Sequence, residues 1–160
     1  MTEPYETQVF NLLDCEVAED SRVRDGNRFL RTMLGQAVGA KLTGFSIYEL
    51  PPGETAWTYH YELHREEWVI VVDGEVVVRT PKGDRTLRAG DTVCFPPGEE
   101  GAHQVRNESN AVARFAMPSS WAGEGYVAVR PDSNTALIVG PGFRQIVPLD
   151  ESLDYWDREP

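Results

Sequence analysis

The sequence predicts an all-β protein of the sandwich or barrel class, and three observations carry this prediction. Short runs of alternating or β-branched residues follow one another from residue 41 to residue 139. Turn residues such as Pro-Pro-Gly, Asp-Gly and Ala-Gly-Asp separate these runs at close, even spacing. A chain of 160 residues fits one domain, and residues 41–139 are long enough for a double-sheet jelly roll.

The first part of the chain leads into these strands. Residues 1–40 have weak periodicity and many charges, so we expect an N-terminal arm with one or two short strands and an Asp-Gly turn in VRDGNRF. The runs FSIYELPPG and WTYHYEL then alternate, as half-buried strands do. WVIVV and EVVVRT are β-branched runs separated by Asp73-Gly74, which predicts a two-residue hairpin between them.

The second half continues the same pattern. PKGD at residues 81–84 predicts the next turn, and RTLRAGDTVCFPPG predicts two short strands around Ala89-Gly90-Asp91. Four further strands are expected in AHQVRN, ARFAMP, YVAVRP and TALIVG. Residues 140–160 are expected to form a C-terminal tail packed on the barrel, and its acidic end LDESLDYWDREP could hold one helical turn.

The charge of the chain excludes some classes of partner. It has 26 acidic against 15 basic side chains, a net charge of −11, whereas a nucleic-acid or anionic membrane surface requires clustered Lys and Arg. No apolar run reaches the length of a membrane span, and no signal peptide is evident, so we expect a cytoplasmic protein. Cys15 and Cys94 form no CxxC motif and are expected to remain thiols.

The stretch YHYELHREEW suggests chemistry. If TYHYE is a strand, His60 and Glu62 share one face, while the aromatic residues Trp57, Tyr59 and Tyr61 face the other way. Glu67 begins the next strand, and His103 begins a later one. Two imidazoles and two carboxylates converging inside a small barrel would make a good divalent-metal site.

These residues stand at spacings that resemble the two motifs of the cupin superfamily, G-x5-H-x-H-x3-4-E-x6-G and G-x5-P-x-G-x2-H-x3-N. Gly53 stands one residue further from His60 than the first motif has it, and Gly98 stands two residues further from His103 than the second has it. The match covers residues 53–107, and the flanks are similar to small, single-domain bacterial cupins without a settled function. The matching positions of the two motifs are Gly53, His60, Glu67 and Gly74, then Gly90, Pro96, Gly98, His103 and Asn107.

The resemblance implies a double-stranded β-helix, the jelly-roll barrel of the conserved-barrel type, with a divalent ion at its mouth and often a homodimer. The ligands would be His60, Glu62, Glu67 and His103, and the ion iron, manganese, zinc or nickel. Glu62 stands where the family has a second histidine, and the added oxygen ligand favours harder ions over copper. Two close carboxylates cannot both ionise cheaply, so one is expected to titrate high.

We expect a metalloenzyme of the isomerase, lyase or dioxygenase type that acts on a small polar molecule in the barrel. The sequence assigns no catalytic residue. One alternative is a non-catalytic barrel that binds a sugar or carboxylate and has lost its metal, and another is a remnant barrel kept for protein contacts. His64 is interpreted as a solvated turn residue, although a tight turn could make it a third imidazole ligand.

Overall fold

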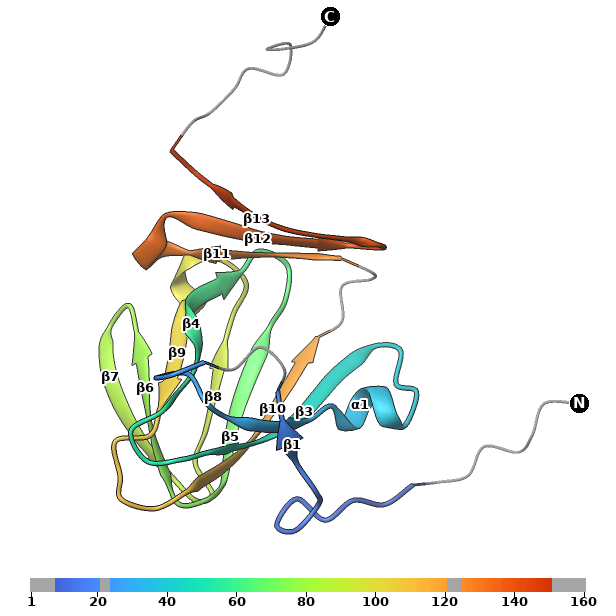
Figure 1. Ribbon diagram of the computed structural model, residues 1–160, viewed down its shortest axis with the longest axis vertical. Coiled ribbons are helices and arrows are strands. Elements are labelled where there is room, and N and C mark those ends of the chain that lie inside the picture. The colour runs from blue at the N-terminus through green and yellow to red at the C-terminus, as the bar shows by residue number, and fades with distance from the viewer. Residues whose placement is uncertain (1–7, 21–23, 121–124, 151–160) are drawn as a thin grey trace, which may run out of the picture.

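The computed structural model describes residues 8–20, 24–120 and 125–150, and their strands form two antiparallel sheets that enclose a barrel (Figure 1). The predicted all-β jelly-roll class is confirmed. One sheet has, in spatial order, β1 (Ala18–Glu19), β2 (Leu30–Thr32), β3 (Thr43–Leu50), β10 (Ala113–Ser120), β5 (Glu67–Asp73) and β8 (Thr92–Phe95). The other has β13 (Phe143–Pro148), β12 (Thr135–Gly140), β11 (Tyr126–Arg130), β4 (Thr55–Glu62), β9 (His103–Arg106), β6 (Glu75–Thr80) and β7 (Gly83–Arg88).

The barrel interior is filled by alternate residues of both sheets. In β5, Val69 and Val71 follow Glu67 at spacings of two and are almost fully buried, as the sequence predicted. Residues of the facing sheet, such as Val78 and Val105, meet them across the barrel. Apolar burial of this kind contributes roughly 25 cal/mol for each Å² removed from water, so these alternating positions stabilise the fold.

The predicted hairpin at Asp73-Gly74 is wrong. Strand β5 pairs with β8 and β10, whereas β6 pairs with β7 and β9 in the other sheet. Both strands bury one face in the same core, and they do so from opposite sides of the barrel. Gly74 turns the corner with φ 75°, and a Cβ there would lie 3.0 Å from the carbonyl oxygen of Val112.

The turn predicted at residues 81–84 does join a hairpin, because β6 and β7 pair directly up to Thr80 and Gly83. In the N-terminal arm, the expected Asp-Gly turn is also present, with a bridge between Arg24 and Asn27. The two cysteines are free thiols, as expected.

The N-terminal arm covers the outer face of the first sheet. The short helix α1 (Leu34–Ala37) lies against β3, and Leu34 packs on Ile47 and Ala116 (Figure 1). Arg114 of β10 fastens the preceding segment, because its guanidinium donates hydrogen bonds to the carbonyl oxygens of Leu12 and Cys15. The parts of the arm around Cys15 and Leu34 therefore cover the outer face of the sheet, whereas Phe29 packs in the barrel core.

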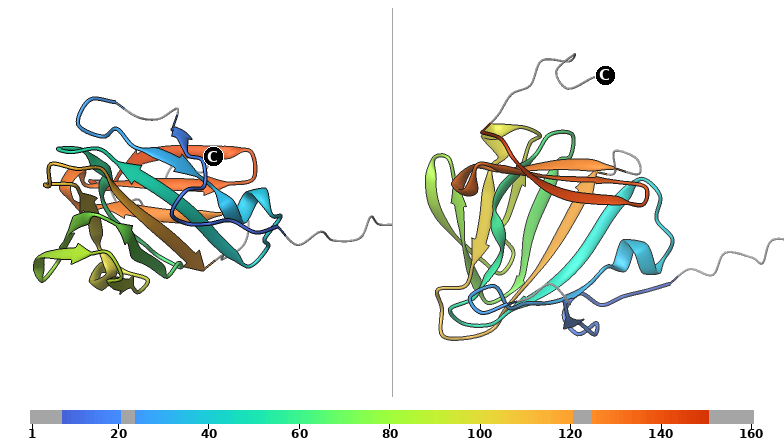
Figure 2. Two further views of the ribbon diagram at one scale, coloured as in Figure 1. Left: turned by 90° about the horizontal axis from the view of Figure 1, so that it is seen from below. Right: turned by 45° about the horizontal axis from the view of Figure 1, so that its top comes forward.

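The last three strands extend the second sheet across one end of the barrel (Figures 1 and 2). Strand β11 joins β4, and β12 and β13 follow outward from it. The barrel boundary predicted at residue 139 falls inside β12, and β13 occupies part of the segment assigned to a tail. A helical turn is considered for LDESLDYWDREP. Most of this stretch lies beyond residue 150 and so outside the described residues.

Two 3-10 helices, η1 (Glu99–Gly101) and η2 (Pro131–Ser133), complete the described elements. None of the helices in the described ranges combines the length and the apolar character that crossing a membrane requires.

Candidate metal centre

His60 and His103 lie opposite each other on neighbouring strands of one sheet. They are register partners in the pairing of β4 with β9, and their ring centroids are 4.9 Å apart. The ring of His103 also stacks on Phe95 at 3.8 Å, and only 2% of the residue is exposed. The local pairing thus brings two predicted ligands, 43 positions apart in the chain, to one point inside the barrel.

A bulge in β4 sets the direction of His60. The register of β4 against β9 shifts between Ala56 and His60, and Trp57 adopts φ 61° there. The expectation that Trp57 faces outward with Tyr59 is therefore wrong: its ring is partly buried and packs against the core, 4.5 Å from the ring of Phe29. A simple alternation rule fails at such a bulge, because it inserts a residue without a partner.

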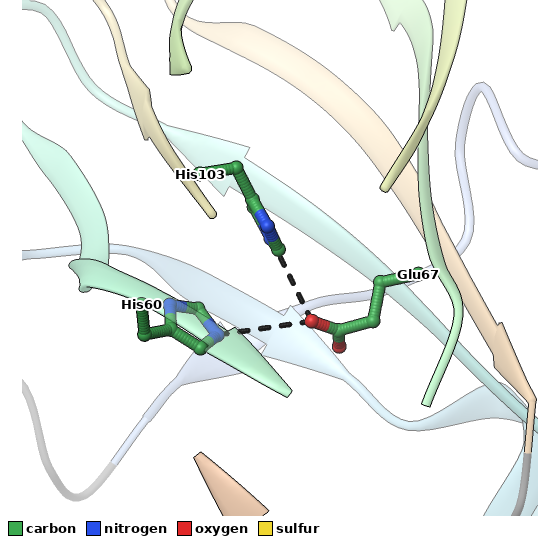
Figure 3. Close-up of side chains that lie close together, drawn as sticks. All are labelled: His60, Glu67 and His103. Carbon is green, nitrogen blue, oxygen red and sulfur yellow. Dashed lines mark ion pairs between the residues drawn. The ribbon is translucent and has the colours of Figure 1, made fainter. Parts of the chain in front are cut away.

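Glu67 reaches this pair from the opposite sheet. It is the first residue of β5, and its Oε2 lies 3.7 Å from Nε2 of His60 and 3.6 Å from Nε2 of His103 (Figure 3). The three ligand atoms lie within 4.8 Å of one another. The centre therefore joins the two sheets through side chains that point toward one another.

The imidazoles are oriented by their own backbone. Nδ1 of His60 donates to the carbonyl oxygen of Thr58 at 2.8 Å, and Nδ1 of His103 donates to that of Gly101 at 2.9 Å. Because a carbonyl oxygen only accepts, the proton must sit on Nδ1 in each ring. This leaves Nε2 as the nitrogen that faces Glu67, and such hydrogen bonds are what orient histidine ligands in metal sites.

Two buried polar atoms of the group lack hydrogen-bond partners among the described residues. Oε2 of Glu67 and Nε2 of His103 are both inaccessible to solvent and accept or donate no hydrogen bond there. An unsatisfied buried polar atom costs about 1–3 kcal/mol, more when it is charged. Two imidazole nitrogens and a carboxylate oxygen are ligands that a divalent transition ion accepts, so the residues present fit such an ion.

The charges of the group are coupled. Burial and the positive charge of His60 lower the pKa of His103 to about 4, so this ring is neutral at physiological pH. Burial alone would lower the pKa of His60, but Glu67 outweighs it and holds that pKa above its usual range. Burial alone would raise the pKa of Glu67, but its contact with His60 and the charges of His103 and Arg65 hold it below its usual range.

Glu62 lies at the edge of this group. It is the last residue of β4, and 6% of it is exposed. Burial, with the negative charge of Glu67 adding to it, raises the pKa of Glu62 to about 7. The prediction that one of two neighbouring carboxylates titrates high is thus confirmed. Glu62 is not among the side chains whose ligand atoms lie within 4.8 Å of one another, and its place as a fourth ligand stays a prediction.

Two further residues of the motif region are placed clearly. His64 is exposed in the connection between β4 and β5 and is outside the ligand group of the described residues. Asn107 ties two loops, because its Nδ2 donates to the carbonyl oxygens of Leu50 and Ala111 at 2.7 Å each. Asn107 therefore has a structural role in these loops.

A cavity of about 1150 Å³ opens beside the group, and His60, Glu62 and Glu67 line it. Part of its wall comes from the C-terminal strands: alternate residues of β11, together with side chains of β12 and β13. Sequence reasoning missed these wall residues. The alternation in YVAVRP was visible, but nothing in it indicates which face turns to the cavity. The wall residues are Tyr126, Ala128, Arg130, Leu137, Arg144 and Ile146.

Comparison with known proteins agrees with this architecture. Residues 46–118 match the model of the family described as Cupin domain. Comparison with curated protein sequences finds no match.

Several solved structures are similar. A proposed sugar phosphate isomerase from Acidithiobacillus ferrooxidans has a TM-score of 0.79 at 21% identity, over 89% of this chain and 91% of that one. A sugar phosphate isomerase of the cupin superfamily from Silicibacter pomeroyi has a TM-score of 0.78 at 23% identity, over 92% and 98%. A predicted oxalate decarboxylase from Thermotoga maritima has a TM-score of 0.59 at 23% identity, over 71% and 98%. The motif residues, the two-sheet barrel and the Cupin domain match over residues 46–118 agree, so this part of the chain is similar to the cupin superfamily.

Proposed function

We propose that this protein is a metal-dependent enzyme that acts on a small polar organic molecule bound in the cavity. One observation carries the proposal: His60, Glu67 and His103 converge on each other beside a cavity of about 1150 Å³. The cavity is large enough to hold a small organic molecule. A carboxylate whose Oε2 is buried between two oriented imidazoles is an arrangement that a divalent cation stabilises.

In this proposal His60, Glu67 and His103 hold the ion, and Glu62 is the fourth ligand if its side chain turns toward the other three. A bound iron, manganese, zinc or nickel ion would supply Lewis-acid polarisation of a substrate oxygen. The residues themselves orient the ligand nitrogens and exclude water, because His103 and Glu62 are buried. Isomerase, lyase and dioxygenase reactions remain the proposed classes, and the names of the similar structures include an isomerase and a decarboxylase.

Metal content tests the proposal. Protein purified without a metal-affinity tag is measured by inductively coupled plasma mass spectrometry, as isolated and after reconstitution. We expect near-stoichiometric metal in the wild type and its loss in His60→Ala. His64→Ala is the matched control, because it removes an exposed imidazole from the same segment and should leave metal content unchanged. Absence of metal from the wild type after reconstitution would contradict the proposal.

A second candidate is a non-catalytic barrel that binds a sugar or carboxylate without metal. The observation that favours it is the position of Glu62, which lies outside the three-residue ligand group where the cupin pattern has a histidine. Ligand binding by metal-free protein, equal in the wild type and in His60→Ala, would support this candidate. We also propose a homodimer in the cytoplasm, and light scattering coupled to size-exclusion chromatography tests the dimer.

A further inference from the structure

The lining of the cavity has the opposite charge to the rest of the chain. The whole chain has a net charge of −11. Among the described residues, three carboxylates line the cavity, Asp20, Glu62 and Glu67, and Asp20 is already paired with Arg31 at 2.6 Å. With this pair set aside, two carboxylates and five cationic side chains of the described residues line the cavity. These five are Arg24, Lys41, Arg65, Arg130 and Arg144.

Arg130 is held on the cavity face of β11. It follows Tyr126 and Ala128 at spacings of two, and all three line the cavity. Ala128 is the register partner of Glu62, so Arg130 lies roughly 7 Å further along the strand, taking about 3.4 Å for each residue. Its Nε is buried and makes no hydrogen bond within the described part of the chain. A buried guanidinium donor of this kind is costly unless a ligand accepts from it.

Arg65 also lines the cavity. It belongs to the connection between β4 and β5, and its guanidinium carbon sits 4.0 Å from the ring centroid of Tyr126. Stacking on an aromatic ring restricts the orientation of a guanidinium. The charge of Arg65 acts on both site carboxylates, because it lowers the pKa of Glu62 and of Glu67. Arg65 is therefore within electrostatic reach of the candidate metal centre.

The need to neutralise Glu62 and Glu67 does not by itself explain why arginine side chains line the cavity. In the proposed function a divalent ion binds Glu67, and Glu62 either binds the same ion or lies next to it. The ion's charge of +2 then balances the charges of both carboxylates. The buried Nε of Arg130 then still makes no hydrogen bond with the described residues, in a partly enclosed cavity where the low dielectric strengthens its effect on a ligand. An anionic group on the ligand would accept a hydrogen bond from this nitrogen.

We propose that the cavity takes a small molecule that carries an oxyanion, a phosphate or carboxylate group, and that Arg130 and Arg65 bind this group. The inference rests on the proposed function for the orientation of the ligand in the cavity. In that orientation the reactive part of the ligand would face His60, Glu67 and His103. The guanidinium fork matches the oxygens of phosphate and carboxylate. Leu137 and Ile146 on the same wall offer apolar contact to the carbon skeleton.

The test uses inorganic phosphate and acetate as probes on the full chain. Proton–nitrogen NMR spectra that select arginine Nε–H groups are recorded while each probe is added, and the Arg130 signal is assigned by its loss in Arg130→Gln. We expect the signals of Arg130 and Arg65 to shift with phosphate. Removing a charge-assisted hydrogen bond should weaken phosphate binding about tenfold or more in Arg130→Gln and in Arg65→Gln. Acetate serves to separate a carboxylate preference from a phosphate preference.

The matched control is Arg85→Gln. Arg85 is exposed on β7, the strand at the far edge of the sheet from β13, and does not line the cavity. It should leave phosphate binding unchanged. Arg130→Lys keeps the charge and guards against a folding defect, and it should lose less affinity than Arg130→Gln.

Metal binding is measured by calorimetry on the same samples, which keeps the two proposals apart. If metal binds but neither probe moves the Arg130 signal, the anion inference is overturned and the metalloenzyme proposal stands. If phosphate binds through Arg130 while no metal binds, the anion inference stands and the metal proposal fails. Equal phosphate affinity in the wild type and Arg130→Gln would also overturn the inference.

Discussion

His60 and His103 are register partners across two strands, and each donates its Nδ1 proton to the carbonyl oxygen two residues before it. The donor set is therefore fixed by backbone pairing and not by loose side-chain contacts. Two imidazoles held in this way keep Nε2 turned toward Glu67 without needing an ion to orient them. Such preorganisation lowers the entropic cost of binding a metal.

Replacing Glu67 by Gln should weaken metal binding about 100-fold, because it removes the charged oxygen at the centre of the group. It should also lower the pKa of His60, since burial, which acts to lower that pKa, is then no longer opposed by Glu67. Calorimetry measures the first effect and NMR titration of metal-free protein the second. Glu66→Gln is the control, because Glu66 is the exposed neighbour. A pKa of His60 that stays raised in Glu67→Gln would contradict this account.

Metal affinity should fall as the pH drops through the pKa of His60. That pKa lies above the ordinary value of 6.5, so near neutral pH a proton on His60 competes with the ion, whereas His103, with a pKa of about 4, is already neutral. Calorimetry in buffers of different ionisation enthalpy counts the protons released. If Glu62 is also a ligand, Glu62→Gln should release about one proton fewer than the wild type below the pKa of Glu62. Equal proton release would remove Glu62 from the ligand set.

Metal-free protein should lose stability as the pH rises through the range set by Glu62. The folded pKa of about 7 exceeds the ordinary value of 4.5, so ionisation of Glu62 opposes folding. Its contribution is most favourable below 4.5, declines between 4.5 and about 7, and then levels off. Above this range, Glu62→Gln should raise the free energy of unfolding by up to about 3 kcal/mol. Urea unfolding measures it, with the exposed Glu100→Gln as control, and a pH-independent difference would argue against this origin.

Arg114→Ala should detach the N-terminal arm from the outer face of the barrel. Its guanidinium donates to the carbonyl oxygens of Leu12 and Cys15 and pairs with Glu49, and only 8% of the residue is exposed. The loss should cost about 3 kcal/mol, because Glu49 keeps a partly buried charge without its partner. Chemical denaturation measures the cost, and hydrogen exchange should show faster exchange at residues 11–17. Arg85→Ala is the control. Unchanged exchange in the arm would show that other contacts hold it.

The sequence was sufficient for the fold class and for three of the side chains that meet, because both are encoded locally. His60, Glu67 and His103 stand at spacings that repeat a known pair of motifs, and the alternation of Val69 and Val71 marks the core face of β5. Local patterns of this kind survive folding unless the backbone departs from regular geometry.

The errors arise where geometry is not local. Asp73-Gly74 has the residues of a tight hairpin, but the choice between a hairpin and a corner depends on which sheet each strand joins. The bulge at Trp57 reverses the face of that residue with no composition signal. Arg65 and Arg130 line one cavity because β11 pairs with β4, a contact between segments far apart in the chain.

In the sheet that runs from β13 to β7, the strands that carry the histidines differ from the strands that form much of the cavity wall. Strands β4 and β9 carry the two histidines, whereas β11, β12 and β13 carry much of the cavity wall and join the barrel through the pairing of β11 with β4. The hairpin of β12 and β13 can therefore be lengthened, shortened or exchanged without altering the pairing that aligns the imidazoles. Ligand specificity and metal binding can thus change independently of each other during the evolution of this chain.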